Sequence, residues 1–205
     1  GRVQATRVTL STGVTTIPIA GESEYAGRDN PHAWMSPTNG EIYVSNIEKA
    51  LTDLDPPGAD TYRANAERYR AELRAVASDL RSQLATLAPT QRALVTCEGA
   101  FSYLARDAAL SEAYLWPVNA EQEGTPRQIA SVVSFVRANR VPAVFCESTV
   151  SDKGQRQVAR ESGARFGGTL YVDSLSEADG PVPSYLALLR HAAATIVGGL
   201  TGSNA

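Results

Sequence analysis

Hydrophobic residues recur at every third or fourth position through much of residues 37–87, which is the spacing of a helix with one buried face. The pattern predicts one helix from Pro37 that stops before the turn sequence Asp55-Pro56-Pro57-Gly58. A longer helix is predicted over 60–87, with charged residues on its other faces. At 1.5 Å per residue it would be about 43 Å long, so we expect either a coiled coil or a strut along two lobes.

Beyond residue 89 short apolar runs alternate with helical spacing. Strands are predicted at 93–97, 113–117, 143–147 and 169–173, and helices at 100–108, 126–139, 153–162 and from 183 to about 197. This alternation predicts a parallel sheet with right-handed crossovers. The expected fold class is therefore α/β, with a four-stranded parallel sheet flanked by helices. Residues 5–19 are rich in β-branched side chains, and we expect two short extended segments there.

Composition excludes several partners. The 205 residues are 43% hydrophobic and 20% charged, with a net charge of −3 and no basic run, which argues against nucleic acid and an anionic membrane surface. No apolar stretch approaches the length of a transmembrane helix. The chain starts at Gly1 without an initiator Met, so we expect a processed or truncated product. For Cys97 and Cys146 we expect reduced, buried thiols, because neighbouring parallel strands seldom offer disulfide geometry.

The candidate chemistry lies in one histidine and three acids. His32 is between two nearby prolines and beside Trp34, although a buried structural histidine in a turn is the simpler interpretation. Glu98, Glu147 and Asp173 each follow an apolar strand, where ligands of parallel sheets bind, but where acids also cap helices. Nitrogen and oxygen donors without thiolates favour Mn²⁺ or Fe²⁺ over a structural zinc site. The second histidine, His191, is expected to face solvent on a helix.

Five segments carry a family resemblance: N-P-H-A-W (30–34), V-T-C-E-G-A-F-S-Y (95–103), E-G-T-P-R-Q-I (123–129), F-C-E-S (145–148) and V-D-S-L (172–175). In order and separation they resemble the manganese- and zinc-binding solute receptors of bacterial ABC importers, often surface lipoproteins and in some cases described as adhesins. The resemblance implies two α/β lobes joined by one long helix, with metal in the cleft. It assigns residues 1–55 to a remnant of the N-terminal lobe, 56–88 to the linking helix and 89–205 to the C-terminal lobe.

The resemblance also implies a ligand set. His32 matches the family's second ligand, Glu98 the third and Asp173 the fourth. The first is a histidine upstream that nothing in this sequence matches, so the chain resembles an N-terminally truncated receptor. Glu147 is expected to orient the site or cap a helix without touching the ion. Resembling zinc receptors usually have histidine as the third ligand, so Glu98 favours Mn²⁺, with Fe²⁺ second and Zn²⁺ third; a metal-free form remains the alternative.

The implied function is that of an extracytoplasmic receptor that delivers the ion to an ABC permease and catalyses no reaction. It would be anchored to the membrane through a lipidated N-terminus not present in this chain. The apolar face left by the missing lobe is expected to find a partner, for example in a dimer. Two other hypotheses are a metal-dependent hydrolase that uses His32, Glu98 and Asp173 around an activated water, and a surface adhesin with a structural metal.

Overall fold

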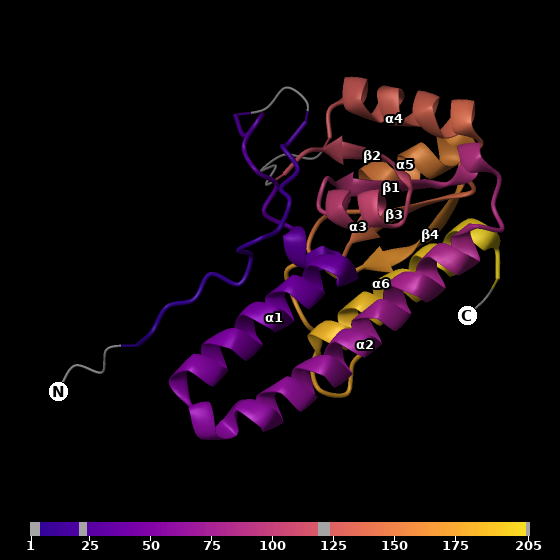
Figure 1. The fold of residues 1–205 in the computed structure, drawn as a ribbon. Helices are drawn as coiled ribbons and strands as arrows, with labels where there is room; N and C mark the ends of the chain where they lie inside the picture. Colours follow the sequence, from indigo (N-terminus) through magenta and orange to yellow (C-terminus); the bar gives the residue numbers. More distant parts are fainter. Residues whose placement is uncertain (1–4, 21–23, 119–123, 204–205) are drawn as a thin grey trace.

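The chain folds into an α/β structure in which parallel strands lie between helices (Figure 1). The computed structural model describes residues 5–20, 24–118 and 124–203, so the first residue of the 123–129 segment lies outside the described part. The helices are α1 (Pro37–Leu54), α2 (Ala59–Leu84), α3 (Ser102–Asp107), α4 (Pro126–Asn139), α5 (Lys153–Ser162) and α6 (Tyr185–Thr201), and 3₁₀ turns are η1 (Ala33–Met35), η2 (Pro56–Gly58) and η3 (Pro89–Gln91). The strands are β1 (Ala93–Glu98), β2 (Ser111–Trp116), β3 (Ala143–Glu147) and β4 (Arg165–Leu170).

Helices cover the strands on both sides. α4 and α5 lie on one side, and α6 with α2 on the other (Figure 1). Every residue of β1 and β3 is buried, as expected for strands between two helical layers. None of the helices in the described ranges is long and apolar enough to cross a membrane.

The long predicted helix is present as α2, but it ends at Leu84 rather than at residue 87. The Arg92 guanidinium donates to the carbonyl oxygens of Ala85 at 2.8 Å and Leu87 at 3.1 Å. These carbonyl oxygens therefore have a side-chain partner in place of further helical hydrogen bonds, which agrees with the earlier end of the helix. With 26 residues α2 is about 39 Å long. It packs against α1 in a helical hairpin and against α6 (Figure 1), and its role as a strut along two lobes remains a prediction.

The bounds predicted for α4 and α5 are confirmed, because both helices carry strong local signals. Thr125 caps α4 by accepting from the backbone N–H of Gln128, whose side chain accepts from the Thr125 N–H in return. α5 ends at Gly163, which has a φ of 82° in the left-handed region. The final helix, predicted to end near residue 197, runs four residues further, to Thr201.

The parallel pairing of strands is confirmed, but a continuous four-stranded ladder is not. β1 pairs with β2, and β3 pairs with β4, in two separate two-stranded sheets. β1 and β3 are neighbours, yet no backbone ladder joins them within the described residues. Side chains take its place: the Gln155 amide donates to Val95 O at 3.0 Å, and the Glu147 carboxylate accepts the Glu98 N–H at 3.3 Å.

The expectation of reduced cysteines is wrong. Cys97 of β1 and Cys146 of β3 form a disulfide, with Cα atoms 4.9 Å apart. The expectation assumed a regular ladder between neighbouring strands, and here that ladder is missing, so the two side chains can face each other. The bond closes a loop of 49 residues, which stabilises the folded chain by about 4 kcal/mol in the chain-entropy account.

The last strand lies earlier than predicted. β4 is Arg165–Leu170, and not 169–173, so Asp173 follows the strand by three residues. The glycines after Phe166 weaken the strand signal in the sequence, but they serve close packing. The Phe145 ring lies against Gly167 and Gly199, and a Cβ atom on Gly199 would come within 2.5 Å of that ring.

Residues 5–19 do not form strands. The described part of this segment has one isolated antiparallel bridge, between Pro18 and Asp29, in place of the two predicted extended elements. Backbone hydrogen bonds join Ile19 to Arg28 at 2.7 Å and Asn30 to Ile17 at 2.8 Å. The pairing brings Asn30 to the edge of the strand region, where the candidate site begins.

Candidate metal centre

His32 lies at the centre of the site and is 3% exposed. It follows Pro31 and directly precedes η1, so the backbone on both sides is restrained. The Asn30 side-chain oxygen accepts from the His32 backbone N–H at 3.0 Å, and it lies 3.0 Å from ring atom Nδ1. One side chain therefore holds both the backbone and the ring of His32.

Asn30 also determines which ring nitrogen carries the proton. Its Nδ2 donates to the carbonyl oxygen of Gly99 at 2.7 Å, and a carbonyl oxygen can only accept. The amide oxygen is therefore the atom that faces His32, so Nδ1 must be the protonated nitrogen. The lone pair of the neutral ring is then on Nε2, which is the form that binds a metal ion.

Two carboxylates approach this nitrogen. Glu98 Oε1 lies 4.0 Å from His32 Nε2, and Asp173 Oδ1 lies 3.9 Å from it. Two donors that are each about 2.1 Å from one ion lie at most about 4.2 Å apart, so each carboxylate can share an ion with the ring. The structure thus brings the three predicted ligands together from distant parts of the chain.

The two carboxylates differ in exposure and in freedom to move. Glu98 ends β1 and is 7% exposed, whereas the Asp173 side chain is 50% exposed. Among the described residues, the donor atoms of His32, Glu98 and Asp173 are not all within 4.8 Å of one another. Since each acid is within 4.0 Å of His32, the wider gap is between the two acids. Coordination of one ion by all three would require the two acids to come closer together.

Trp34 connects His32 to the segment that carries Asp173. Its ring centroid is 5.2 Å from that of His32, and its indole N–H points to Val172 O at 3.4 Å. The Tyr185 hydroxyl of α6 donates to Trp34 O at 2.6 Å. The aromatic side chain therefore packs between the residue before Asp173 and the His32 ring.

The protonation state of His32 suits a ligand. Burial lowers the pKa of the imidazole below its ordinary value, and the negative charges of Glu98 and Asp173 act in the opposite direction. Because burial is the largest effect, the ring is neutral at pH 7. A neutral imidazole does not have to lose a proton before it binds metal.

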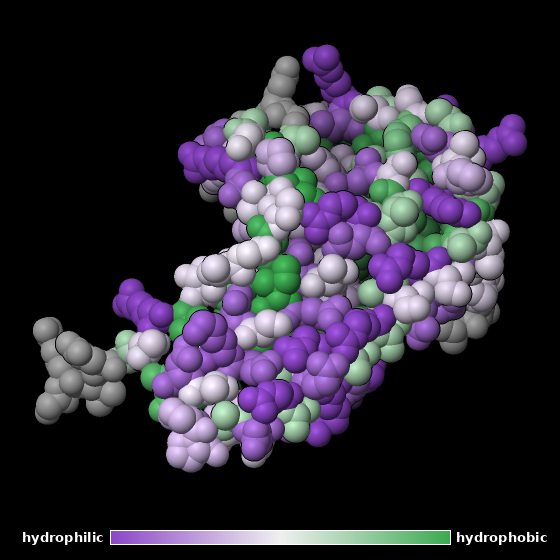
Figure 2. Space-filling model, viewed as in Figure 1, coloured by the Kyte–Doolittle hydropathy of each residue, from purple (hydrophilic) through white to green (hydrophobic). Residues whose placement is uncertain are grey.

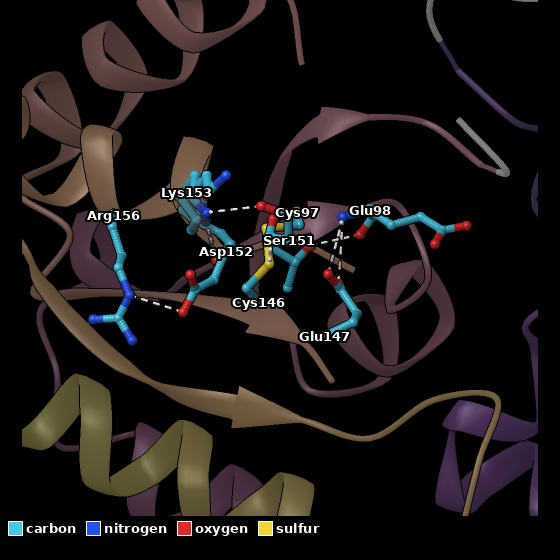
Figure 3. The surroundings of a disulfide bond; sticks show 11 residues. Cys97, Glu98, Cys146, Glu147, Ser151, Asp152, Lys153 and Arg156 are labelled. Atoms are coloured by element: carbon cyan, nitrogen blue, oxygen red, sulfur yellow. Dashed lines mark hydrogen bonds and ion pairs between the residues drawn. A yellow bond between two sulfur atoms is a disulfide. The ribbon is translucent and has the colours of Figure 1, made fainter. Parts of the chain in front are cut away.

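Glu147 lies behind Glu98 and not among the donors around His32. Both of its carboxylate oxygens accept from the Glu98 backbone N–H at 3.3 Å, while the Glu98 side chain extends away from it (Figure 3). This contact fixes the backbone from which the Glu98 carboxylate projects. The placement agrees with a supporting position, and the supporting role itself remains a prediction.

Burial raises the pKa of the Glu147 carboxyl to about 8, and the charge on Glu98 adds to this effect. Backbone N–H groups of Glu147 itself, Glu98 and Cys97 act in the opposite direction. The folded chain therefore holds a proton on Glu147 over a pH range in which the unfolded chain, with a carboxyl pKa near 4.5, does not.

Asn30 is the residue of the site whose role the sequence did not reveal. It belongs to the 30–34 segment that carries the family resemblance, but the resemblance gives it no role. The available signal was its position two residues before a histidine and directly before Pro31, where Asn side chains commonly bond the backbone two residues on. His191, the other histidine, lies on α6 with Nε2 3.3 Å from Thr169 O and takes no part in the centre.

Glu147→Gln should make the folded state less sensitive to pH. A raised pKa contributes stability that is complete below the unfolded value near 4.5 and is lost as pH rises through about 8. We expect the unfolding free energy of the wild type to fall relative to the variant between pH 5 and 8, by up to a few kcal/mol. Urea titrations at several pH values measure it, with exposed Glu177→Gln as the control. Parallel curves for wild type and Glu147→Gln would contradict the buried proton.

Comparisons with known proteins agree with this arrangement. Residues 2–199 match the family model of ZnuA, the periplasmic component A of the zinc-uptake complex. The chain is 50% identical over 190 residues to the iron-binding protein YfeA of Yersinia pestis, a match that covers 93% of this chain and 61% of that protein. It is 33% identical over 192 residues to the metal ABC transporter substrate-binding lipoprotein ScbA of Streptococcus cristatus, covering 94% of this chain and 62% of that one.

A solved structure shows the same fold. The manganese-bound form of a periplasmic metal-binding protein from Candidatus Liberibacter asiaticus superposes with a TM-score of 0.84 at 41% identity, covering 94% of this chain and 70% of that chain. This chain spans about 61% of the length of the two curated relatives named above. The match to the family model over nearly all of its length establishes that the chain belongs to the ZnuA family of metal-binding receptors of ABC importers.

Proposed function

We propose that the chain binds a divalent metal ion through His32, Glu98 and Asp173 and delivers it to an ABC permease. The observation that supports this most directly is the lone pair on Nε2 of a buried, neutral imidazole, with a carboxylate oxygen on either side at 3.9 and 4.0 Å. Relatives named as metal-transporter substrate-binding proteins support the role in transport. Because this chain covers only part of their length, the activity of the whole protein is a proposal.

We propose Mn²⁺ as the ion, then Fe²⁺, and Zn²⁺ third. Two carboxylates and one imidazole make an oxygen-rich donor set, which suits Mn²⁺ and Fe²⁺, whereas zinc sites are commonly richer in nitrogen and sulfur. The names of the relatives include iron and manganese, and the family model is a zinc-uptake component. The natural affinity order still lets Zn²⁺ bind in a test tube, so bound zinc alone would not contradict manganese uptake.

The ion would enter and leave on the Asp173 side. His32 and Glu98 are almost completely buried, while Asp173 is half exposed and follows β4 on a loop. Movement of this loop changes one ligand and leaves two in place. Coordination positions beyond these three would be filled by water or by further donor groups, and His191, the other histidine, takes no part in the centre.

The proposal keeps the division of the chain made from the sequence. Residues 1–55 would be part of an N-terminal lobe that supplies His32, 56–88 the linking helix, and 89–205 the C-terminal lobe that supplies both acids. We propose an extracytoplasmic location with attachment to the membrane by a lipid, as the name of ScbA describes for that relative. Membership in a family of substrate-binding receptors supports a binding role without a catalysed reaction.

We further propose that a second copy of the chain covers an apolar groove between α1 and α2. The groove has a volume of about 520 Å³ and is lined by aromatic and aliphatic side chains, among them Tyr43, Val44, Ile47, Leu51 and Tyr69. Figure 2 shows that the face of the α1–α2 hairpin turned to the viewer is mostly hydrophilic. Two of the exposed large hydrophobic side chains of the described residues, Ile47 and Leu51, lie in this groove. Such clustering marks a surface that is covered by protein.

Titration with Mn²⁺ tests the metal centre. The wild-type chain should bind one Mn²⁺ in isothermal titration calorimetry, and Asp173→Asn should weaken binding at least about tenfold, because the variant loses a charged donor. Asp179→Asn, an exposed acid six residues away, is the matched control and should bind normally. Absence of saturable binding of Mn²⁺, Fe²⁺ and Zn²⁺ to the wild type would overturn the proposal.

Asn30→Ala should weaken Mn²⁺ binding by about 10- to 100-fold, although Asn30 does not touch the ion. The ring of His32 would lose the acceptor that keeps the proton on Nδ1 and the lone pair on Nε2. Asn39→Ala is the matched control, because Asn39 is equally buried and donates to Ala33 O at 3.0 Å without contact to the ring. Equal affinity losses in both variants would mean that general destabilisation, and not ring orientation, is responsible.

Leu51→Glu should abolish self-association, because it places a charge in the groove. Sedimentation velocity over a range of protein concentrations should show a dimer for the wild type and a monomer for the variant. Leu175→Glu changes an exposed leucine outside the groove and should leave the dimer intact. A wild-type chain that stays monomeric at every concentration would refute the second copy as occupant.

A further inference from the structure

Cys97, Cys146 and Glu147 form a second cluster of potential metal ligands. Among the residues that the structure describes, these are the three side chains whose donor atoms all lie within 4.8 Å of one another. Both cysteines are completely buried and Glu147 is 2% exposed. The two sulfurs are joined in a disulfide, and a disulfide sulfur is not the thiolate that metals bind. The chemistry of this cluster therefore depends on its oxidation state.

Hydrogen bonds hold the third potential ligand, Glu147, in place and leave lone pairs on its oxygens free. Backbone N–H groups of Glu98, Cys97 and Glu147 itself bond the Glu147 carboxylate, and a carboxylate has about four lone-pair positions. A fourth donor is adjacent, because Ser151 O lies 3.7 Å from Cys146 Sγ, and Figure 3 shows Ser151 beside the sulfur atoms. Two sulfurs and two oxygens make up the four positions that zinc occupies in proteins.

The strands allow the sulfurs to separate after reduction. In a tetrahedral site with Zn–S bonds of about 2.3 Å, two sulfurs lie about 3.8 Å apart. No backbone ladder joins β1 to β3 in the described part of the chain, so the cysteines can turn apart without breaking one. On this seam the Gln155 side-chain oxygen of α5 is buried without a hydrogen-bond partner among the described residues, while its amide nitrogen bonds Val95 O of β1. The contact between β1 and β3 therefore has one unused hydrogen-bond acceptor, the Gln155 side-chain oxygen, and the two cysteine side chains can move there without loss of backbone hydrogen bonds.

We propose that the reduced chain binds one thiophilic dication of the Zn²⁺ class through Cys97 Sγ, Cys146 Sγ and a Glu147 oxygen. A trialkylphosphine reduces the disulfide: phosphorus gives two electrons to the sulfurs, water supplies its oxygen to the phosphine oxide, and two protein thiols form. The cation then displaces the two thiol protons and the proton held on the buried Glu147 carboxyl group into solvent, and it is bound by two thiolates and one carboxylate oxygen. Ion binding and the disulfide exclude each other, because both use the same sulfur atoms.

This site differs in preference from the centre at His32. Thiolates select soft ions such as Zn²⁺ and Cd²⁺, whereas two carboxylates and an imidazole suit Mn²⁺. The distinction makes the two sites separable in one sample, and the inference stands independently of the proposed uptake function. In a reducing environment the chain would carry one thiophilic ion in addition to any ion at His32. A disulfide reagent such as oxidised glutathione, which takes two electrons from the thiolates and is itself reduced to two thiols, would re-form the Cys97–Cys146 bond and release the ion.

The experiment is a Cd²⁺ titration of the phosphine-reduced chain, followed by the ultraviolet absorption of cadmium–thiolate bonds. We expect the absorption to saturate at one equivalent, to be absent from the disulfide form and from Cys97→Ala/Cys146→Ala, and to be reversed by Zn²⁺. Glu147→Gln should weaken Cd²⁺ binding at least about tenfold. Asp173→Asn should leave this absorption unchanged, because Asp173 belongs to the other centre.

Circular dichroism before and after Cd²⁺ addition covers the case in which reduction unfolds the chain. Recovery of the folded spectrum with one equivalent of Cd²⁺ supports the site, since metal binding is then coupled to folding. Failure of the ion to restore the fold overturns the inference. The absence of thiolate absorption in a folded reduced chain also overturns the inference. Unchanged Cd²⁺ affinity in Glu147→Gln overturns it as well, because it would indicate simple chelation by two cysteines.

Discussion

The hydrogen bond between the Asn30 side-chain oxygen and His32 Nδ1 is the interaction on which the candidate centre depends. The same amide donates to Gly99 O, one residue beyond Glu98, and the Tyr103 hydroxyl donates to Asn30 O at 2.7 Å. One buried asparagine therefore fixes the tautomer of the histidine and also attaches its segment to the end of β1. Without it, the ring would lose its hydrogen-bond acceptor, and the His32 segment would lose one of its bonds to the end of β1.

Burial gives the three donors different tasks. A buried imidazole that stays neutral and a buried acid that stays in place form a permanent half of the centre. The half-exposed Asp173 is the part that water and an incoming ion can reach. Trp34 ties that loop to the ring of His32 through Val172 O, so the mobile ligand is limited in how far it can move. In the proposed centre, one exposed ligand beside two buried ones would allow an ion to be released as well as bound.

The missing backbone ladder between β1 and β3 explains why several polar side chains and the disulfide gather between these two strands. A regular ladder would have paired the backbone groups of both strands with each other. Here a carboxylate, an amide and a disulfide occupy that line. The carboxyl ends of β1 and β3 thus carry two acids with opposite surroundings: Glu98 faces the histidine, and Glu147 faces the backbone behind it. The same strand ends that position the metal ligand also create the buried cysteine pair.

Much of this protein follows from the sequence by itself, because the responsible signals are local. The Thr125-Pro126 start and the Gly163 end define α4 and α5, and the helical period defines α1 and most of α2. Alternating strands and helices predict the parallel α/β fold, and the order of motifs indicates the family and suggests His32, Glu98 and Asp173 as ligands. The tertiary structure decided what depends on contacts between distant residues: the Cys97–Cys146 disulfide, the divided sheet, the position of Asp173 beyond β4 and the role of Asn30. Each of these features depends on contacts between residues that are 49 or more positions apart in the chain, or on glycines such as Gly167 that make room for an aromatic ring. Such pairings are selected by packing of the whole core and leave no periodic trace in the sequence.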